Sequence, residues 1–152
     1  MHPTALRFQE RAAAQGLVVE PVELADSTRT AEEAAAAVGC ELGQIVKSVV
    51  LLDAGGEAVL CLCAGDRRVD LDRIGEGVAM ARGKEVKEAT GYAIGGVPPL
   101  GHDRPLRTVV DASLRRFESV WCAAGTPHAV CEVRLDELLA AIPAADVRDV
   151  TG

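Results

Sequence analysis

Lys47 is the residue whose chemistry is hardest to reconcile with its surroundings. Residues 45–52 read Ile-Val-Lys-Ser-Val-Val-Leu-Leu, which is the pattern of a strand buried on both faces. With the two-residue period of a strand, Lys47 shares a face with Ile45, Val49 and Leu51. An ammonium group among aliphatic side chains is costly unless an anion or several acceptors meet it. We therefore expect an anion or several hydrogen-bond acceptors near the ammonium of Lys47.

Two structural explanations account for Lys47 without any function. The lysine could pair with a buried carboxylate, or the strand could lie at a sheet edge and let the side chain reach solvent. Taken alone, Lys47 is explained better by these alternatives than by a functional role. Further motifs along the chain are needed to change that balance.

A glycine- and proline-rich loop at residues 95–101 is the second unusual feature. Gly95 and Gly96 let the backbone turn freely and let a ligand approach main-chain N–H groups. Pro98 and Pro99 stiffen the segment that follows Val97. A rigid loop of backbone donors suits a carbonyl or a phosphate, whereas a plain surface turn is the alternative. The loop matches neither dinucleotide-binding nor P-loop glycine patterns.

A second turn, at residues 125–128, carries Gly125, Thr126 and His128. Alone, it is best explained as a hairpin turn with an exposed histidine. His102 adjoins an aspartate in a loop, where it could be structural or solvated.

The cysteines favour a structural role. Cys61 and Cys63 are two residues apart on an expected strand, so they face the same way, but one such pair is weak evidence for a metal site. Buried free cysteine behaves as a small apolar residue, and no base is spaced to activate a cysteine nucleophile. We therefore expect neither a metal nor any other cofactor.

The remaining pattern predicts an α+β domain. Helices are expected at residues 3–15, 30–39, 83–90 and 135–142, and strands at 18–24, 45–52, 58–63, 67–72, 108–110, 119–123 and 129–133. Residues 53–57 give a hairpin signal between two of the strands. Short strands in hairpin order favour a curled, mostly antiparallel or mixed sheet with flanking helices, and residues 1–152 should form one compact domain.

Composition restricts the classes of function. The formal charge of −7 argues against nucleic-acid binding through a broad basic surface, although a small site could still grip one nucleotide end. No run of residues approaches the length of a membrane span, so no membrane partner is expected. The five cysteines have no small-domain disulfide spacing, and a reducing cytoplasm is the simplest setting for them.

Taken together, three stretches resemble the YbaK/ProX/EbsC family of prolyl-tRNA-editing-like deacylases. They are residues 45–48, residues 65–68 and residues 90–101, in order and with compatible spacing. A later strand and turn, residues 121–127, is similar to a subgroup of that family. The resemblance covers roughly residues 30 to 140 and implies a cleft that binds the 3′ end of a mischarged tRNA.

The resemblance also implies roles for individual residues. Lys47 would be the characteristic functional residue, with Ser48 beside it. The pocket would be lined by the glycine loop and the later turn, namely Gly95, Gly96, Val97, Pro98, Gly125 and Thr126. His128 falls near a position where some members carry a functional histidine, and in this family that position varies.

The sequence thus predicts a free-standing aminoacyl-tRNA deacylase that acts in trans on a small amino acid, on tRNA-Pro or a related tRNA. Its expected partners are the aminoacyl-tRNA 3′ end and, transiently, a synthetase or an elongation factor. The alternative is a non-catalytic module that binds a nucleotide or a partner on the same fold, because a binding pocket would need the same residues.

Overall fold

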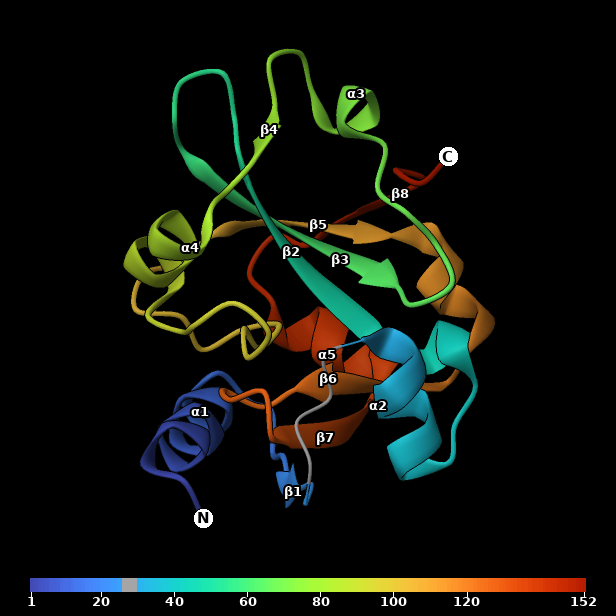
Figure 1. Cartoon of the computed structure of the whole chain (residues 1–152). Coiled ribbons are helices and arrows are strands. Elements are labelled where there is room, and N and C mark those ends of the chain that lie inside the picture. Colours follow the sequence, from blue (N-terminus) through green and yellow to red (C-terminus); the bar gives the residue numbers. More distant parts are fainter. Residues whose placement is uncertain (26–29) are drawn as a thin grey trace.

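The computed structural model describes residues 1–25 and 30–152, which form two β-sheets with helices packed around them (Figure 1). The helices are α1 (Pro3–Ala14), α2 (Ala31–Val38), α3 (Leu71–Ile74), α4 (Gly83–Thr90) and α5 (Leu135–Ala141), with 3-10 turns η1 (Leu42–Gln44) and η2 (Ala112–Arg116). The strands are β1 (Val22–Glu23), β2 (Val46–Leu52), β3 (Ala58–Ala64), β4 (Ala79–Met80), β5 (Arg107–Asp111), β6 (Ser119–Ala123), β7 (Ala129–Arg134) and β8 (Asp146–Arg148).

The larger sheet has the strand order β4-β2-β3-β5-β8 and the smaller one β1-β7-β6. Strands β4, β2 and β3 pair antiparallel, whereas β5 pairs parallel with both β3 and β8. A parallel bridge between Ile45 and Trp121 joins the start of β2 to β6, where the two sheets meet. The expected α+β class with a mixed sheet is confirmed, with its strands divided between two sheets.

Local signals in the sequence place the ends of the helices correctly. Thr30 caps α2 because its hydroxyl accepts a hydrogen bond from the Glu33 N–H at 3.1 Å. The same helix ends at Gly39, and α4 ends at Gly91; both glycines have a positive φ, of 75° and 84° respectively. The hairpin between β2 and β3 also forms as expected, closed by a 2.8 Å bond from Asp53 N–H to the Glu57 carbonyl.

The alternation along β2 sends its side chains into two separate cores. Val46 and Val50 belong to the main core, which fills the space between the two sheets together with α1 and α5. Leu51 and the half-buried Val49 pack on the opposite face with Cys61 of β3 and residues near the C-terminus. Lys47 lies on this second face by the period of the strand, as the sequence predicted.

Two strand predictions were wrong in whole or in part. Residues 67–72 form no strand, because Asp70 caps the short helix α3 and Val69 makes only an isolated bridge to Thr151. Of residues 18–24 only β1 is a strand; Val19 is buried, whereas Val18 is 85% exposed. The sequence analysis missed α3, β4 and β8, which are too short to show a period.

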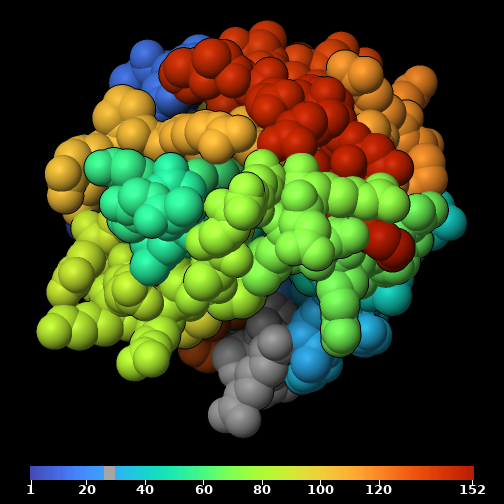
Figure 2. Space-filling view, turned by 90° about the horizontal axis from the view of Figure 1, so that it is seen from above, coloured from blue at the N-terminus to red at the C-terminus, as the bar shows by residue number. Residues whose placement is uncertain are grey.

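A buried carboxylate fastens the C-terminal residues to the larger sheet. Asp111, only 1% exposed, accepts hydrogen bonds from the Val150 N–H at 2.9 Å and the Thr151 hydroxyl at 3.3 Å, and also from the Ser113 N–H and hydroxyl. Burial alone would raise the pKa of Asp111, but these hydrogen bonds outweigh it and lower that pKa. Figure 2 shows the C-terminal segment beside the segment that carries α3 and β4.

None of the helices formed by the described residues combines the length and the apolar character that crossing a membrane requires.

Candidate functional site

A cavity of about 190 Å³ lies where the two sheets meet. This volume is below the 300–1,000 Å³ typical of drug-sized ligand pockets, so it suits a small group. Its walls come from α2, the start of β2, the glycine loop, β6 and the turn before β7. The lining residues are Thr30, Ala31, Ala34, Ile45, Val46, Lys47, Ser48, Gly95, Val97, Trp121, Cys122, Ala123, Thr126, Pro127, Ala129 and Val130.

Of the residues predicted for the site, five line this cavity: Lys47, Ser48, Gly95, Val97 and Thr126. The structure therefore brings together segments that are up to about eighty residues apart in the sequence. The alanines Ala31 and Ala34 of α2 also line it, because their short side chains let this helix approach β2 closely. These two alanines were not among the site residues predicted from the sequence.

Strand β2 has an open edge beside the cavity. Strand β4 pairs only with Leu51 and Leu52, and the Ala81 N–H donates to the Val50 carbonyl at 3.1 Å. Because main-chain groups alternate in direction along a strand, those of Ser48 point to the same side as those of Val50. Within residues 1–25 and 30–152, no strand pairs with β2 at Ser48 on that side. A backbone donor and acceptor are therefore available to a polar ligand.

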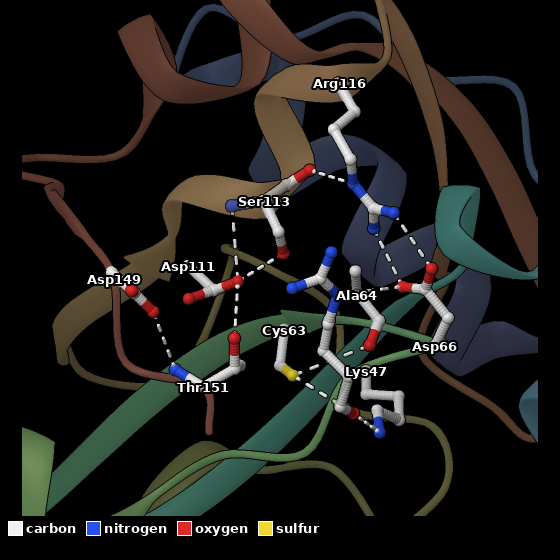
Figure 3. A network of polar contacts seen from close by, with 10 residues as sticks. Lys47, Cys63, Ala64, Asp66, Asp111, Ser113, Arg116, Asp149 and Thr151 are labelled. Atoms are coloured by element: carbon white, nitrogen blue, oxygen red, sulfur yellow. Dashed lines mark hydrogen bonds and ion pairs between the residues drawn. The ribbon is translucent and has the colours of Figure 1, made fainter.

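Lys47 is half-buried and donates a hydrogen bond from its ammonium Nζ to the main-chain carbonyl of Arg67 (Figure 3). It forms no ion pair with any carboxylate in the described part of the chain. Strand β4 pairs with β2 only at Leu51 and Leu52, so β2 is a sheet edge beside Lys47. Among the described residues, the carboxylate explanation offered by the sequence does not fit, because the carbonyl positions the ammonium without neutralising its charge. The edge explanation agrees with the half-buried side chain.

The Ser48 hydroxyl is buried and finds no hydrogen-bond partner among residues 1–25 and 30–152. Ser48 shares a face of β2 with Val46, another residue of the cavity wall. A buried polar group without a partner costs about 1–3 kcal/mol, so a ligand that hydrogen-bonds to it would recover that energy.

The glycine loop and the later turn touch backbone to backbone. A Cβ atom on Gly96 would lie 2.7 Å from the Cα of Thr126, which is closer than real Cβ contacts come. Gly125 has a φ of 101°, and a Cβ there would lie 2.9 Å from the carbonyl oxygen of Thr4. Gly96 and Gly125 are therefore required by packing rather than by contact with the cavity.

Side chains outside the cavity hold the glycine loop in place. The buried Tyr92 donates its hydroxyl to the Gly101 carbonyl at 2.8 Å, and a ring nitrogen of His102, Nε2, lies 2.8 Å from the Pro98 carbonyl. Burial lowers the pKa of His102, so the ring is neutral at pH 7 and donates its Nε2–H to that carbonyl. His102 therefore has the structural role rather than the solvated one. Pro98 does not line the cavity, and its carbonyl helps to hold the glycine loop in place.

The cysteines beneath Lys47 are protonated at neutral pH. Cys61 and Cys63 are fully buried on β3, where Cys63 pairs with Lys47 across the strands. Burial raises the pKa of Cys61 to about 12 and that of Cys63 to about 11. A thiol is a poor nucleophile and a poor metal ligand compared with a thiolate, so neither cysteine suits either task.

His128 is exposed at the turn before β7 and is not part of the cavity wall. Its N–H donates to the Thr126 hydroxyl at 3.2 Å, and its carbonyl accepts from the Leu24 N–H at 2.7 Å. The residue therefore contributes to the turn through its main chain.

For a reaction catalysed in this cavity, replacing His128 with Ala should lower the rate by less than about tenfold. General acid–base catalysis contributes roughly 10²–10⁴-fold, and an exposed ring outside the cavity is not positioned to supply it. The measurement is the pH–rate profile of both proteins. A fall of about a thousandfold, with loss of a titration near roughly pH 6.5 where histidines ordinarily titrate, would instead assign His128 as the general base.

A comparison with protein families identifies the domain. The family model of the aminoacyl-tRNA editing domain matches residues 25–141. The chain belongs to this family. The match contains every lining residue of the cavity, and it confirms the YbaK-type resemblance carried by the motifs around Lys47 and the glycine loop.

Relatives of this editing domain extend the comparison. A solved structure described as a "putative trans-editing enzyme for prolyl tRNA synthetase" is 44% identical, with a TM-score of 0.92, covering 100% of this chain and 99% of that one. The "uncharacterized protein YwhH" of Bacillus subtilis is 34% identical over 76% of this chain and 76% of its own length. The "putative Cys-tRNA(Pro)/Cys-tRNA(Cys) deacylase EbsC" of Enterococcus faecalis is 26% identical over 63% of this chain and 62% of its own length.

Proposed function

We propose that this editing domain is an aminoacyl-tRNA deacylase that acts in trans, with residues 1–152 forming one domain. It would hydrolyse the ester between a small amino acid and the terminal ribose of a mischarged tRNA, with tRNA-Pro as the first candidate. The observation that carries the proposal is the small cavity in which Lys47 and the open edge of β2 face the glycine loop. Its five free thiols suit a reducing cytoplasm, where it could meet a synthetase or an elongation factor transiently.

The geometry suits a reaction that needs positioning more than a protein nucleophile. An aminoacyl ester is already activated, so its hydrolysis requires a placed water and stabilisation of the developing oxyanion. Lys47 supplies a positive charge that no carboxylate of residues 1–25 and 30–152 neutralises, and the main chain of Ser48 and of the glycine loop would supply hydrogen bonds. The ribose hydroxyl next to the ester would activate the water. The unpartnered Ser48 hydroxyl would bind a polar group of the aminoacyl moiety.

Deacylation of a panel of mischarged tRNAs tests the proposal. The protein should release the amino acid from at least one small aminoacyl-tRNA faster than buffer does. Measuring tRNA binding in parallel distinguishes the alternative, because tight binding without release would identify a non-catalytic module.

We expect selectivity for a small side chain, such as that of alanine, serine, cysteine or a small non-protein amino acid. A cavity of about 190 Å³ has to accommodate the ester as well as the side chain, which favours a small side chain over an aromatic one. An apolar pocket distinguishes each methylene by about 1–3 kcal/mol, so phenylalanyl- and tyrosyl-tRNA should react at least about tenfold more slowly. Equal or faster cleavage of those two substrates would contradict this assignment of the cavity.

Activity should not require a metal ion. Within residues 1–25 and 30–152, no three His, Cys, Asp or Glu side chains are grouped so that they could hold one, and Cys61 and Cys63 alone are too few. The rate of the purified protein should be the same before and after treatment with a chelator. Loss of activity that zinc restores would show that this expectation is wrong.

A further inference from the structure

The contact that holds Lys47 is made by the backbone of a turn, not by a side chain. The turn follows β3, at residues 64–67, and its Arg67 carbonyl accepts the hydrogen bond from Nζ of Lys47 (Figure 3). The same carbonyl lies 3.5 Å from the Cys63 sulfur. Because the acceptor belongs to the main chain, the position of the ammonium depends on the path of the turn.

The turn is fastened at its base. The Gly65 N–H donates to the Ile45 carbonyl at 2.7 Å, and the Arg67 N–H donates to the Ala64 carbonyl at 2.9 Å. A Cβ atom on Gly65 would lie 2.4 Å from the carbonyl oxygen of Leu42, so the turn packs tightly against η1. These contacts fix where the turn starts.

A bidentate ion pair between Asp66 and Arg116 holds the turn at residues 64–67 in place. Asp66 accepts hydrogen bonds from two guanidinium nitrogens of Arg116, Nη1 at 2.9 Å and Nη2 at 2.7 Å. About a third of each side chain is exposed, and Arg116 lowers the pKa of Asp66. A bidentate pair of this kind fixes orientation better than a single exposed contact.

Arg116 also makes contacts with two residues of its own segment. Its Nε donates to the Ser113 carbonyl at 2.7 Å, and its guanidinium carbon lies 5.0 Å from the centre of the Phe117 ring. The Ser113 side chain is bound to the buried Asp111 carboxylate (Figure 3). A continuous set of contacts therefore runs from the core of the larger sheet to the ammonium of Lys47.

We propose that Asp66 and Arg116 are positioning residues for Lys47: their ion pair fixes the turn whose Arg67 carbonyl aims the ammonium at the cavity. This inference rests on the proposed function for its effect on rate, but its effect on Lys47 itself can be measured without any substrate. Neither Asp66 nor Arg116 lines the cavity.

The test compares Asp66→Asn and Arg116→Met with the wild type. Asn keeps the shape of the side chain at 66, and Met keeps an apolar stem over Phe117 while removing the guanidinium. The matched control is Arg115→Met, which changes the exposed neighbouring arginine on η2. Thermal unfolding identifies any variant that fails to fold. Because each variant removes the ion pair from a different side, one folded variant is enough for the test.

The first readout is the rate of reductive methylation at Lys47, followed by peptide mass spectrometry, with Lys84 and Lys87 as internal references. Release of the ammonium from the carbonyl should change the Lys47 rate severalfold in both variants and leave the control unchanged. The second readout is single-turnover deacylation. Its maximal rate constant should fall about 10–100-fold, the scale expected for a misplaced group, and the enzyme concentration that gives half of that rate should change little.

Unchanged methylation of Lys47 in folded Asp66→Asn and Arg116→Met proteins would overturn the inference. Deacylation by these variants at the wild-type rate would overturn it as well. A loss of equal size in Arg115→Met would also overturn it, because the effect would not be specific to the pair. If the wild type itself deacylates no substrate, the proposed function fails, and the methylation rates still decide whether the pair positions Lys47.

Discussion

Replacing Lys47 with Met should abolish deacylation while leaving the fold about as stable as the wild type. Among residues 1–25 and 30–152, the ammonium of Lys47 donates to the Arg67 carbonyl alone and forms no ion pair. Removing a lysine that has no carboxylate partner leaves no buried anion behind, so the free energy of unfolding should change by less than about 1 kcal/mol. Activity should be lost because the substrate no longer interacts with a positive charge at this position.

Urea unfolding and single-turnover deacylation of the same protein measure the two effects. Lys87→Met is a matched control, because Lys87 also donates to a main-chain carbonyl, that of Gly91 at 3.1 Å, but lies on α4 outside the cavity wall. The control should keep wild-type activity. A Lys47→Met protein destabilised by roughly 3–5 kcal/mol would return Lys47 to a structural role, because that is the cost of stranding a buried partner charge.

Replacing Gly96 with Ala should lower kcat by about a hundredfold or more. The added methyl group would meet the Cα of Thr126 at 2.7 Å, and backbone cannot move aside as a flexible side chain can. The glycine loop and the later turn must therefore separate, and a displacement of about 1 Å in a catalytic site can cost about a hundredfold in rate. Both segments contribute to the cavity wall through Gly95 and Thr126.

Gly83→Ala controls for the loss of a glycine as such, since Gly83 has no positive φ and no atom within 4 Å of an added Cβ. Circular dichroism and thermal unfolding establish that both variants fold. Wild-type kinetics in a folded Gly96→Ala protein would show that the close approach of loop and turn has no part in the reaction.

Elements defined by local chemistry were predictable from the sequence. Thr30 and Glu33 predicted the start of α2, Gly91 the end of α4, and residues 53–57 the hairpin, because each signal acts within a few residues. The site was predictable only as separate motifs. Lys47 was conspicuous because a charge interrupts an apolar period, and the glycines were conspicuous by composition.

What could not be predicted depends on contacts between distant segments. The acceptor for Lys47 is a main-chain carbonyl, which has no sequence signature, and Asp66 meets Arg116 fifty residues away. Residues 67–72 alternate like a strand, yet Asp70 caps a helix there. The exposure of His128, in contrast, agrees with the hairpin turn that the sequence of residues 125–128 indicates.

The role of Lys47 is tested most directly by the ratio of single-turnover deacylation rates of wild type and Lys47→Met on an alanyl-, seryl- or cysteinyl-tRNA-Pro, with enzyme in saturating excess. We expect a wild-type rate well above spontaneous hydrolysis and a variant rate close to it, a difference of about a hundredfold or more. Equal rates from two folded proteins would contradict it, since the cavity would then not act through Lys47.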